Sequence, residues 1–333
     1  MLTGEFQPLC LVSKIGRQPV AASVAGEDFV VFRGDEGRIG VLIDRCPHRG
    51  MRLSRGRVTG GTLECPYHGW RFDVNGCGQS PANPGITPRA RAVEVTEAGG
   101  VVWIRRPRPD STPLPSLDMS GFQLIHRAFC DIDAPMLAVL DNFTEIEHTG
   151  TGHWEFGFDE QRLDQVQFTT DIGPHRASAR AEGFQKHLSL PSRLALGLRH
   201  GDRLTITIDV TYAPLHVRYA WWWTDRESGK RTGPEFREIA FFAPIYERRS
   251  RLVAYYFWTG GRTGLPFGIG NVLRTAAAQV IRYEIALDIR LCTSLVPGAE
   301  SLSGCHLTRF DALVRAHRNN LSKGEPRGPK ASD

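Results

Sequence analysis

The alternation of apolar and polar residues divides the chain into a strand-rich first third and a mixed remainder. Asp28–Arg33 and Ile39–Ile43 alternate over short runs and predict two strands joined by a glycine-rich turn. Ala92–Val95 and Val101–Ile104 predict a second hairpin of the same kind. Residues 1–108 are therefore predicted to form a small all-β domain.

Prolines mark the end of this domain. Pro107, Pro109, Pro113 and Pro115 lie close together, and neither a helix nor a sheet interior tolerates such a density of proline. Residues 109–118 are therefore predicted to be a linker, with a second domain beyond it.

The pattern of residues 119–320 combines helical and strand periods. A helix is predicted around Ala134–His148, and a final long helix over Asn271–Leu295. Four strands are predicted between them, at Leu204–Thr211, His216–Thr224, Arg237–Pro244 and Arg251–Trp258. This order indicates the α+β class, with an antiparallel sheet and a long C-terminal helix packed on it. The polar residues 321–333 are predicted to be a disordered tail.

Composition and charge exclude several classes of protein. The 333 residues are 41% hydrophobic and 23% charged, as in an ordinary globular chain. The net charge of +5 is mild, and no block of Lys and Arg indicates a nucleic-acid partner. No run of about 18 apolar residues predicts a membrane span, and the N-terminal residues lack the pattern of a secretory signal. We therefore expect a cytoplasmic location.

Cysteine usage points to metal binding. Seven cysteines are an odd number, and their spacing is not that of a small secreted disulfide scaffold. Without an export signal we expect a reducing compartment. Paired cysteines are then better interpreted as metal ligands than as disulfides.

The first candidate metal motif consists of Cys46-Pro47-His48 and Cys65-Pro66-Tyr67-His68, with sixteen residues between the two halves. Each half offers one thiolate and one imidazole. A zinc site more often takes both ligands of a half from a pair of cysteines, although a zinc-stabilised interaction module stays open. The mixed pairs better suit two adjacent irons, one held by two thiolates and the other by two imidazoles.

These two segments, extended to Cys46–Gly50 and Cys65–Phe72, resemble the Rieske [2Fe–2S] signature nearly residue for residue. The resemblance implies that Cys46, His48, Cys65 and His68 bind a [2Fe–2S] cluster. The two imidazole ligands raise the potential of such a cluster, which lets it accept an electron from a ferredoxin.

The second candidate motif lies at the end of the first predicted helix. Glu145 and His148 are three residues apart and would share one helix face. His148 and His153 are five apart, so an unbroken helix would point them about 140° from each other. Gly150 and Gly152 are predicted to break the helix there, which would let His153 turn back toward His148.

Two imidazoles and one carboxylate on one face of Fe(II) are the facial triad of non-heme iron oxygenases. The carboxylate has to come from elsewhere in the chain. Asp288 of the final helix is the preferred candidate, because it lies among Leu, Ile and Ala, where an unpaired charge is costly. Glu284, one turn earlier, is the rival.

The second motif resembles the catalytic domain of Rieske oxygenases, whose pattern is Asn-x-x-Asp-x-x-His-x4-His. Here it starts at Asn142 and has Glu145 in place of the usual Asp. The resemblance implies a helix-grip, START-like fold, and catalytic roles for Asn142 and Glu145. In this family the carboxylate at the position of Glu145 would join His148 to the cluster ligand His68 of the partner subunit.

The resemblance also implies a function. The chain would be the terminal oxygenase of the short monooxygenase or demethylase type, which lacks a β subunit, unlike the longer ring-dihydroxylating type.

 That short type has a single kind of subunit and, in this family, forms a head-to-tail homotrimer. Electrons would come from NAD(P)H through a separate flavin reductase, a ferredoxin or both. With O2 they would hydroxylate, or oxidatively demethylate, a C–H bond of a small apolar or natural-product substrate. A ring-dihydroxylating dioxygenase and a non-catalytic Rieske electron carrier are the alternatives.

Overall fold

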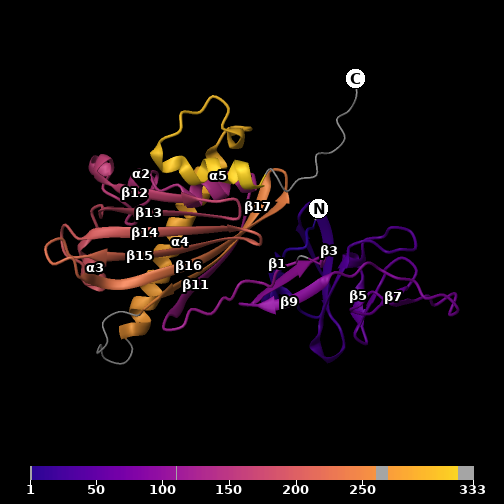
Figure 1. The fold of residues 1–333 in the computed structure, drawn as a ribbon. Helices are drawn as coiled ribbons and strands as arrows, with labels where there is room; N and C mark the ends of the chain where they lie inside the picture. The colour runs from indigo at the N-terminus through magenta and orange to yellow at the C-terminus, as the bar shows by residue number, and fades with distance from the viewer. Residues whose placement is uncertain (1, 110, 260–268, 322–333) are drawn as a thin grey trace, which may run out of the picture. The chain divides into compact units, whose positions relative to one another are not determined.

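The computed structural model describes residues 2–109, 111–259 and 269–321, the last of these without the side chains of its first two residues. The chain divides into two compact units (Figure 1). Unit 1 comprises Met1–Leu117 together with Ala243–Glu247, and unit 2 comprises Asp118–Phe242 together with Arg248–Asp333. The predicted tail lies outside the described residues, apart from its first residue, Leu321.

Unit 1 contains three small antiparallel sheets. Their strand orders are β1-β10-β9, β2-β3-β4 and β5-β6-β7-β8. The strands are β1 (Gln7–Leu11), β2 (Val20–Val24), β3 (Glu27–Arg33), β4 (Ile39–Ile43), β5 (Arg57–Thr59), β6 (Thr62–Glu64), β7 (Arg71–Phe72), β8 (Gly78–Gln79), β9 (Glu94–Ala98) and β10 (Val101–Arg105).

Both hairpins predicted for unit 1 are present, as β3–β4 and β9–β10. β9 begins at Glu94, two residues later than predicted, because Ala92 instead forms an isolated bridge with Leu42 of β4. Valine, leucine and phenylalanine side chains of β3 and β4 fill the core of the unit, with no exposed surface at Phe29, Val31 and Leu42. A core this well packed gives the loops between the strands a rigid base.

Unit 2 is built on one seven-stranded antiparallel sheet with the order β11-β17-β16-β15-β14-β13-β12. Its strands are β11 (Gln123–Ile132), β12 (Gln167–Ile172), β13 (Arg176–Phe184), β14 (Arg203–Tyr212), β15 (Leu215–Thr224), β16 (Arg231–Tyr246) and β17 (Arg249–Trp258). Four of them, β14 to β17, are the four predicted strands. Together with unit 1, this sheet and its long helix confirm the predicted α+β class.

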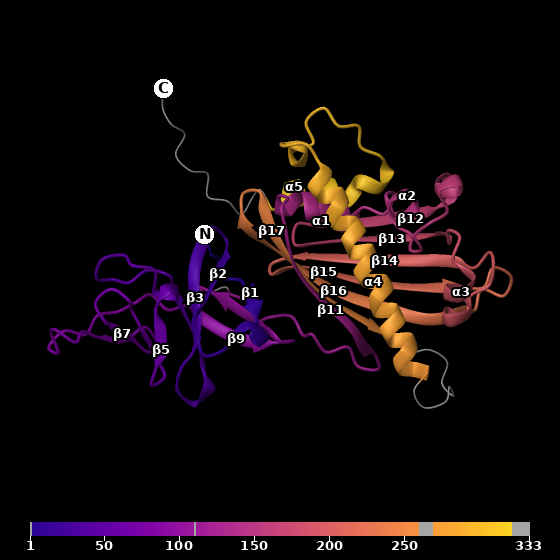
Figure 2. The same ribbon diagram turned by 180° about the vertical axis from the view of Figure 1, so that it is seen from behind.

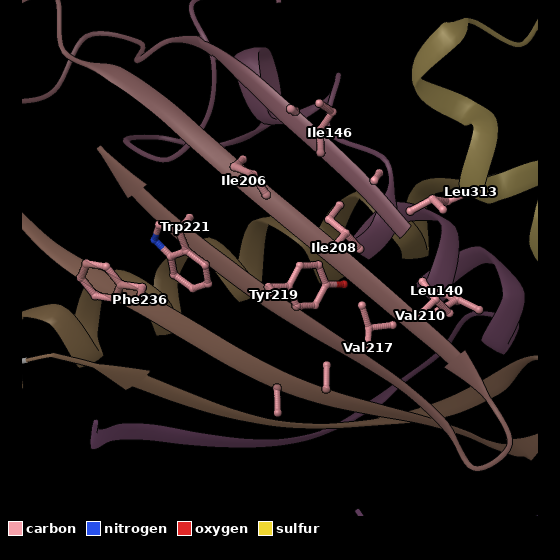
Figure 3. Packing of buried hydrophobic residues seen from close by; sticks show 14 of the residues in the cluster. Leu140, Ile146, Ile206, Ile208, Val210, Val217, Tyr219, Trp221, Phe236 and Leu313 are labelled. Atoms are coloured by element: carbon pink, nitrogen blue, oxygen red, sulfur yellow. The ribbon is translucent and has the colours of Figure 1, made fainter. Parts of the chain in front are cut away.

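One face of this sheet carries the apolar core of unit 2. Alternate residues of β14 and β15, such as Ile206, Ile208, Tyr219 and Trp221, project from the same face (Figure 3). Phe236 of β16 adds its ring to them (Figure 3). This alternation is the period of two that a half-buried strand requires.

Helix α4 (Ile269–Ser294) crosses the same face of the sheet (Figure 2). Glu284, Ile285, Asp288 and Cys292 are its buried positions, spaced three and four residues apart on one side. Two of these four buried side chains are acids, which places two carboxylates inside the unit. No helix among the described residues has both the length and the apolar character needed to cross a lipid bilayer.

The helix predicted around Ala134–His148 is shorter than expected. α1 (Met136–Thr144) ends one residue before Glu145, and a single turn, α2 (Thr149–Gly152), follows. The predicted end of the helix between His148 and His153 is present, because α2 ends at Gly152 and His153 is extended, although Gly150 itself lies within α2.

An earlier break, which was not predicted, lies at Glu145, whose carboxylate accepts hydrogen bonds from the backbone N–H groups of Glu147 and His148. These bonds satisfy N–H groups that a continuous helix would otherwise satisfy, so a new turn starts here. Gly152 has a packing role instead. A Cβ at this position would lie 3.0 Å from the Leu291 side chain of α4.

Two further helices were not predicted. α3 (Leu190–Leu196) follows β13, and α5 (Ala312–Leu321) packs near α1, β12 and β13. His317 of α5 is fully buried. Its Nε2 lies 2.8 Å from Thr144 Oγ1 and its Nδ1 lies 3.0 Å from the Tyr212 hydroxyl.

Thr144 Oγ1 already donates its proton to the Leu140 carbonyl, so it accepts from His317 Nε2. Nδ1 then accepts from Tyr212, and the neutral ring satisfies both partners. Burial, aided by nearby Arg318, lowers the pKa of His317 to about 3. The folded chain therefore keeps this ring neutral well below the pH at which the unfolded chain protonates it.

Acid is expected to destabilise unit 2 through His317. Below pH 6.5 the His317 ring binds a proton in the unfolded state but not in the folded state. The free energy of unfolding therefore falls by about 1.4 kcal/mol for each pH unit below this value. The variant His317→Gln has no group that titrates at this position. It should be less stable than the original chain at pH 7.5, and the difference in free energy of unfolding between the two should shrink by about 2 kcal/mol at pH 5. Urea unfolding followed by tryptophan fluorescence measures both values. The exposed His306 offers the control His306→Gln, whose deficit should not change with pH; an unchanged deficit for His317→Gln would contradict the prediction.

Candidate metal centres and the adjoining cavity

The first candidate centre is formed by two loops of unit 1 with the same construction. In each loop a glycine N–H donates to the carbonyl of the cysteine four residues earlier, from Gly50 to Cys46 at 2.9 Å and from Gly69 to Cys65 at 3.1 Å. Both glycines have a positive φ, +74° and +68°, which other residues rarely adopt. The two cysteines thus lie at equivalent points of two matching tight turns.

The thiols and the imidazoles of these loops differ in exposure. Cys46 and Cys65 are each 2% exposed, whereas His48 and His68 are exposed, with ring centroids 4.5 Å apart. Burial, aided by the neighbouring Cys65 thiol, raises the pKa of Cys46 to about 11. A thiolate at this place therefore needs a bound cation, and two thiolates beside two imidazoles suit a [2Fe–2S] cluster with mixed ligands.

The second candidate centre lies in unit 2, where His148, His153 and Asp288 bring one ligand atom each within 4.8 Å of one another. His153 Nε2 is 2.9 Å from Asp288 Oδ1, and His148 Nε2 is 3.3 Å from the same oxygen. The histidines bound the single turn α2 at its two ends, and Asp288 comes from α4. The structure thus brings together the three residues proposed from the sequence as ligands.

Two neighbouring side chains orient this group. Glu145 Oε2 lies 3.1 Å from His148 Nδ1, which leaves Nε2 directed at Asp288. Asn142 donates from Nδ2 to Asp288 Oδ1 at 2.7 Å. Hydrogen bonds of this kind to the far side of a ligand fix its tautomer and its direction.

Glu284, the rival of Asp288, has a different task. Its Oε2 accepts from the backbone N–H of Trp154 at 3.1 Å, and its Oε1 accepts from those of Glu155 and Phe156 at 2.9 and 3.3 Å. These bonds hold the segment that directly follows His153. The geometry therefore favours Asp288 as the carboxylate ligand, with Glu284 as a support of His153.

The charges of the group are strongly coupled. Burial alone would raise the pKa of Asp288, but its contacts with His148 and His153 lower it to about 2. Burial alone would lower the pKa of His148, but its contacts with Asp288 and Glu145 raise it to about 9. A proton on His148 thus compensates the buried carboxylates, and a divalent cation would take over that charge by displacing the proton.

The residues fit a mononuclear iron. His148 Nε2 is a buried ring nitrogen without a hydrogen-bond partner among the described residues. It lies beside His153 Nε2 and one carboxylate oxygen, and two imidazoles with one carboxylate are the donor set of the facial triad. Such a triad leaves coordination positions free on the side that faces away from the three residues.

A cavity of about 240 Å³ adjoins the three residues. Its lining is mainly aliphatic and aromatic, with Trp221, Phe236 and Tyr256 from the sheet, Phe156 from the segment after α2, and further residues from α4. Apolar enclosure with a few polar groups is typical of sites for small molecules. The aromatic residues of β15 divide as strand alternation requires, because Trp222 does not line the cavity and instead lies under Arg231.

Two functional candidates were missed from the sequence. Lys186 donates from Nζ to the carbonyls of Gly150 and His153, both at 2.7 Å, and so holds α2 and the residue that follows it. Glu238 is an acid at an inward position of β16 and lines the cavity. An acid among alternating apolar residues is a signal that the sequence could have provided for Glu238, whereas nothing local marks Lys186.

Comparison with known proteins identifies the first centre. Residues 5–95 match the Rieske [2Fe–2S] domain. The chain carries a Rieske [2Fe–2S] domain. The predicted [2Fe–2S] cofactor is thereby confirmed for this chain, and the two matching loops of unit 1 lie within the matched residues.

Relatives match about a third of the chain in sequence. Chlorophyllide a oxygenase of Oryza sativa subsp. japonica is 33% identical over 130 residues, which are 38% of this chain and 24% of that protein. The phthalate 4,5-dioxygenase oxygenase subunit of Pseudomonas putida is 36% identical over 122 residues, which are 34% of this chain and 28% of that protein. The chain thus spans about a quarter of the length of these two relatives.

Solved structures share the fold of the whole chain. Dicamba monooxygenase bound to 3,6-dichlorosalicylic acid matches 98% of this Rieske chain and 99% of its own, with a TM-score of 0.78 and 17% sequence identity. At that identity the match shows the fold. The resemblance to Rieske oxygenases that the two motifs indicated is confirmed, in sequence for the Rieske domain and in fold for both units.

Removing the Lys186 ammonium group should loosen the second centre. In Lys186→Met, the carbonyls of Gly150 and His153 lose their donor, so His153 should be held less firmly. Changes to residues that support metal ligands typically weaken binding by roughly 10- to 100-fold, and we expect that loss in Fe(II) affinity. Competition with a chelator measures it.

The [2Fe–2S] absorbance of unit 1 serves as an internal control and should be unchanged. Lys230→Met, at an exposed position, is the matched variant and should bind Fe(II) as the original chain does. Equal Fe(II) affinity in both variants would show that Lys186 does not support the centre.

Proposed function

We propose that this Rieske chain is the terminal oxygenase of a multicomponent system. It uses O2 and electrons from a ferredoxin or a flavin reductase to hydroxylate, or oxidatively demethylate, a C–H bond of a small molecule. NAD(P)H supplies the electrons indirectly, through that reductase. The single observation that carries the proposal is the convergence of His148, His153 and Asp288 beside an apolar cavity in a chain that also has a Rieske domain.

The proposal assigns a role to each ligand residue. Cys46, His48, Cys65 and His68 hold the [2Fe–2S] cluster, and the facial triad of unit 2 holds Fe(II). When bound, the iron activates O2 while the cluster supplies a further electron. Asn142 keeps Asp288 in place through its 2.7 Å hydrogen bond, so the carboxylate oxygen stays directed at both imidazoles.

The cavity walls contribute positioning and exclusion of water. Rings such as Phe156 and Trp221 enclose the space next to the triad and hold an apolar substrate there by contact. Exclusion of water protects the reaction from side processes. The fold shared with dicamba monooxygenase supports monooxygenation in preference to dihydroxylation.

Electron transfer between subunits is part of the proposal. A head-to-tail homotrimer would bring the cluster of one subunit to the iron of the next. Glu145 would then link His148 to His68 of the partner subunit. Its contact with His148 Nδ1 at 3.1 Å supports half of this link.

Metal analysis tests the proposal directly. The purified chain should contain about three irons, two in the cluster and one in unit 2. Asp288→Ala should lose only the iron of unit 2, because the two imidazoles alone leave the cation without a charged ligand. Glu284→Gln keeps an oxygen for the backbone N–H groups and should retain that iron. Iron counts and the electron paramagnetic resonance signal of the cluster measure both results.

Three outcomes would count against the oxygenase. They are zinc in either centre, about two irons in the original chain, or a third iron that survives Asp288→Ala. The two-iron result would favour a Rieske electron carrier. With a substrate in hand, labelled O2 distinguishes the reaction types, since a monooxygenase places one labelled atom in the product and a dioxygenase places two.

Glu145→Gln should keep both metal centres but slow electron transfer to the iron. The amide still accepts hydrogen bonds from the backbone, yet it lacks the charge that stabilises a cationic imidazole. We expect roughly a tenfold slower reoxidation of the cluster in a single turnover, measured by stopped-flow absorbance. Glu147→Gln is the control, because Glu147 bonds to Thr308 and should not affect this rate. An unchanged rate of cluster reoxidation in Glu145→Gln would contradict the proposed role of Glu145 as a link between the two centres.

A further inference from the structure

An acid occupies an inward-facing position of β16. Phe236, Glu238, Ala240 and Phe242 alternate along this strand, and all four are buried. Glu238 is 6% exposed and lies opposite Tyr219 of β15, on the face that carries the core. A carboxyl group in such a place lowers stability unless a partner compensates it.

Four other carboxylates that line the cavity have partners. Glu145 and Asp288 contact the histidines, and Glu284 accepts three backbone N–H groups. Glu155 accepts from the backbone of Ser189 and from the hydroxyl of Ser192. In contrast, Glu238 Oε1 is buried and has no hydrogen-bond partner among the described residues.

Among the residues that the structure describes, Tyr256 is the hydrogen-bond partner of the Glu238 carboxyl group. The hydroxyl of Tyr256 donates a hydrogen bond to it. Burial nevertheless raises the pKa of Glu238 to about 8, and the charge of Asp288 acts in the same direction. Ionising Glu238 in this place therefore costs free energy, and a cation bound in the cavity would offset that cost.

The walls around this carboxyl group are aromatic. The rings of Trp221 and Phe236 stack with centroids 5.3 Å apart, and Trp223 and Trp258 each lie 6.0 Å from Phe236. Aromatic faces attract cations. Within the described part of the chain, the cavity lining contains no lysine or arginine that could neutralise Glu238 or bind an anionic substrate.

We propose that Glu238 determines substrate specificity by binding the protonated amine of a small apolar substrate through its free oxygen Oε1. This inference rests on the proposed function, because it names the substrate class of the same cavity. The ammonium group would donate to Oε1 and lie against the aromatic rings, and the apolar remainder would extend toward the triad. A carboxylate substrate would instead lie beside this buried acid with no basic partner among the described lining residues.

Three probes of matched shape test the charge preference. Benzylamine is cationic at neutral pH, benzyl alcohol is neutral and benzoate is anionic. Binding to the metal-loaded chain is measured by isothermal titration calorimetry, which requires no turnover. Since a charge-assisted hydrogen bond is worth more than a neutral one, we expect benzylamine to bind roughly 10- to 100-fold more tightly than benzyl alcohol, and benzoate to bind least.

Glu238→Gln keeps the shape and one acceptor oxygen but removes the charge. It should reduce the preference for benzylamine over benzyl alcohol to less than about threefold, while the melting temperature stays equal or rises because a buried acid is gone. Glu235→Gln, on the opposite face of the same strand, is the matched control and should keep the preference.

The inference is overturned if the alcohol or benzoate binds as tightly as the amine, or if Glu238→Gln keeps the preference. A lower melting temperature in Glu238→Gln with unchanged probe selectivity would show that Glu238 only supports the fold through Tyr256. Failure of the proposed function is a separate result, because it appears as missing iron in the metal analysis. Amine selectivity can fail while both metal centres are intact.

Discussion

A single buried oxygen, Asp288 Oδ1, organises the second centre. It lies within 3.3 Å of both imidazole Nε2 atoms and accepts a hydrogen bond from Asn142. A carboxylate inside a core is costly without a compensating positive charge, and the raised pKa of His148 shows how the metal-free chain provides one. The same requirement explains why the group suits a divalent cation, which provides that charge without a proton.

The groups around this oxygen come from two parts of the fold, the helix α4 and the segment around α2. The helix α4 crosses the apolar face of the sheet and presents Glu284 and Asp288 one turn apart on its buried side (Figure 2). Glu284 fixes the backbone after His153, while Glu145 starts a new turn and holds the ring of His148. Glu284 and Glu145 thus support the two histidines, and Asp288 is left to face the centre.

Much of this Rieske chain was predictable from local pattern. The strands β14 to β17 and the helix α4 follow from alternation and period, and the cluster signature from its Cys and His spacing. The shortened α1 was not predictable, because its end depends on the carboxylate of Glu145 bonding to backbone N–H groups. Lys186 was missed because its role depends on two carbonyls more than thirty residues away, and sequence pattern carries no information on such contacts.

Two charged side chains, Lys186 and Glu284, hold the short turn α2 and the residues after it without contacting the proposed iron. Lys186 binds carbonyls at its end, and Glu284 binds amides just beyond it. The two histidines at the ends of α2 are therefore kept in position by protein contacts alone. Loss of the iron should accordingly leave an ordered, refillable site, so that inactivation by a mild chelator is reversed on adding Fe(II) without any refolding of the chain.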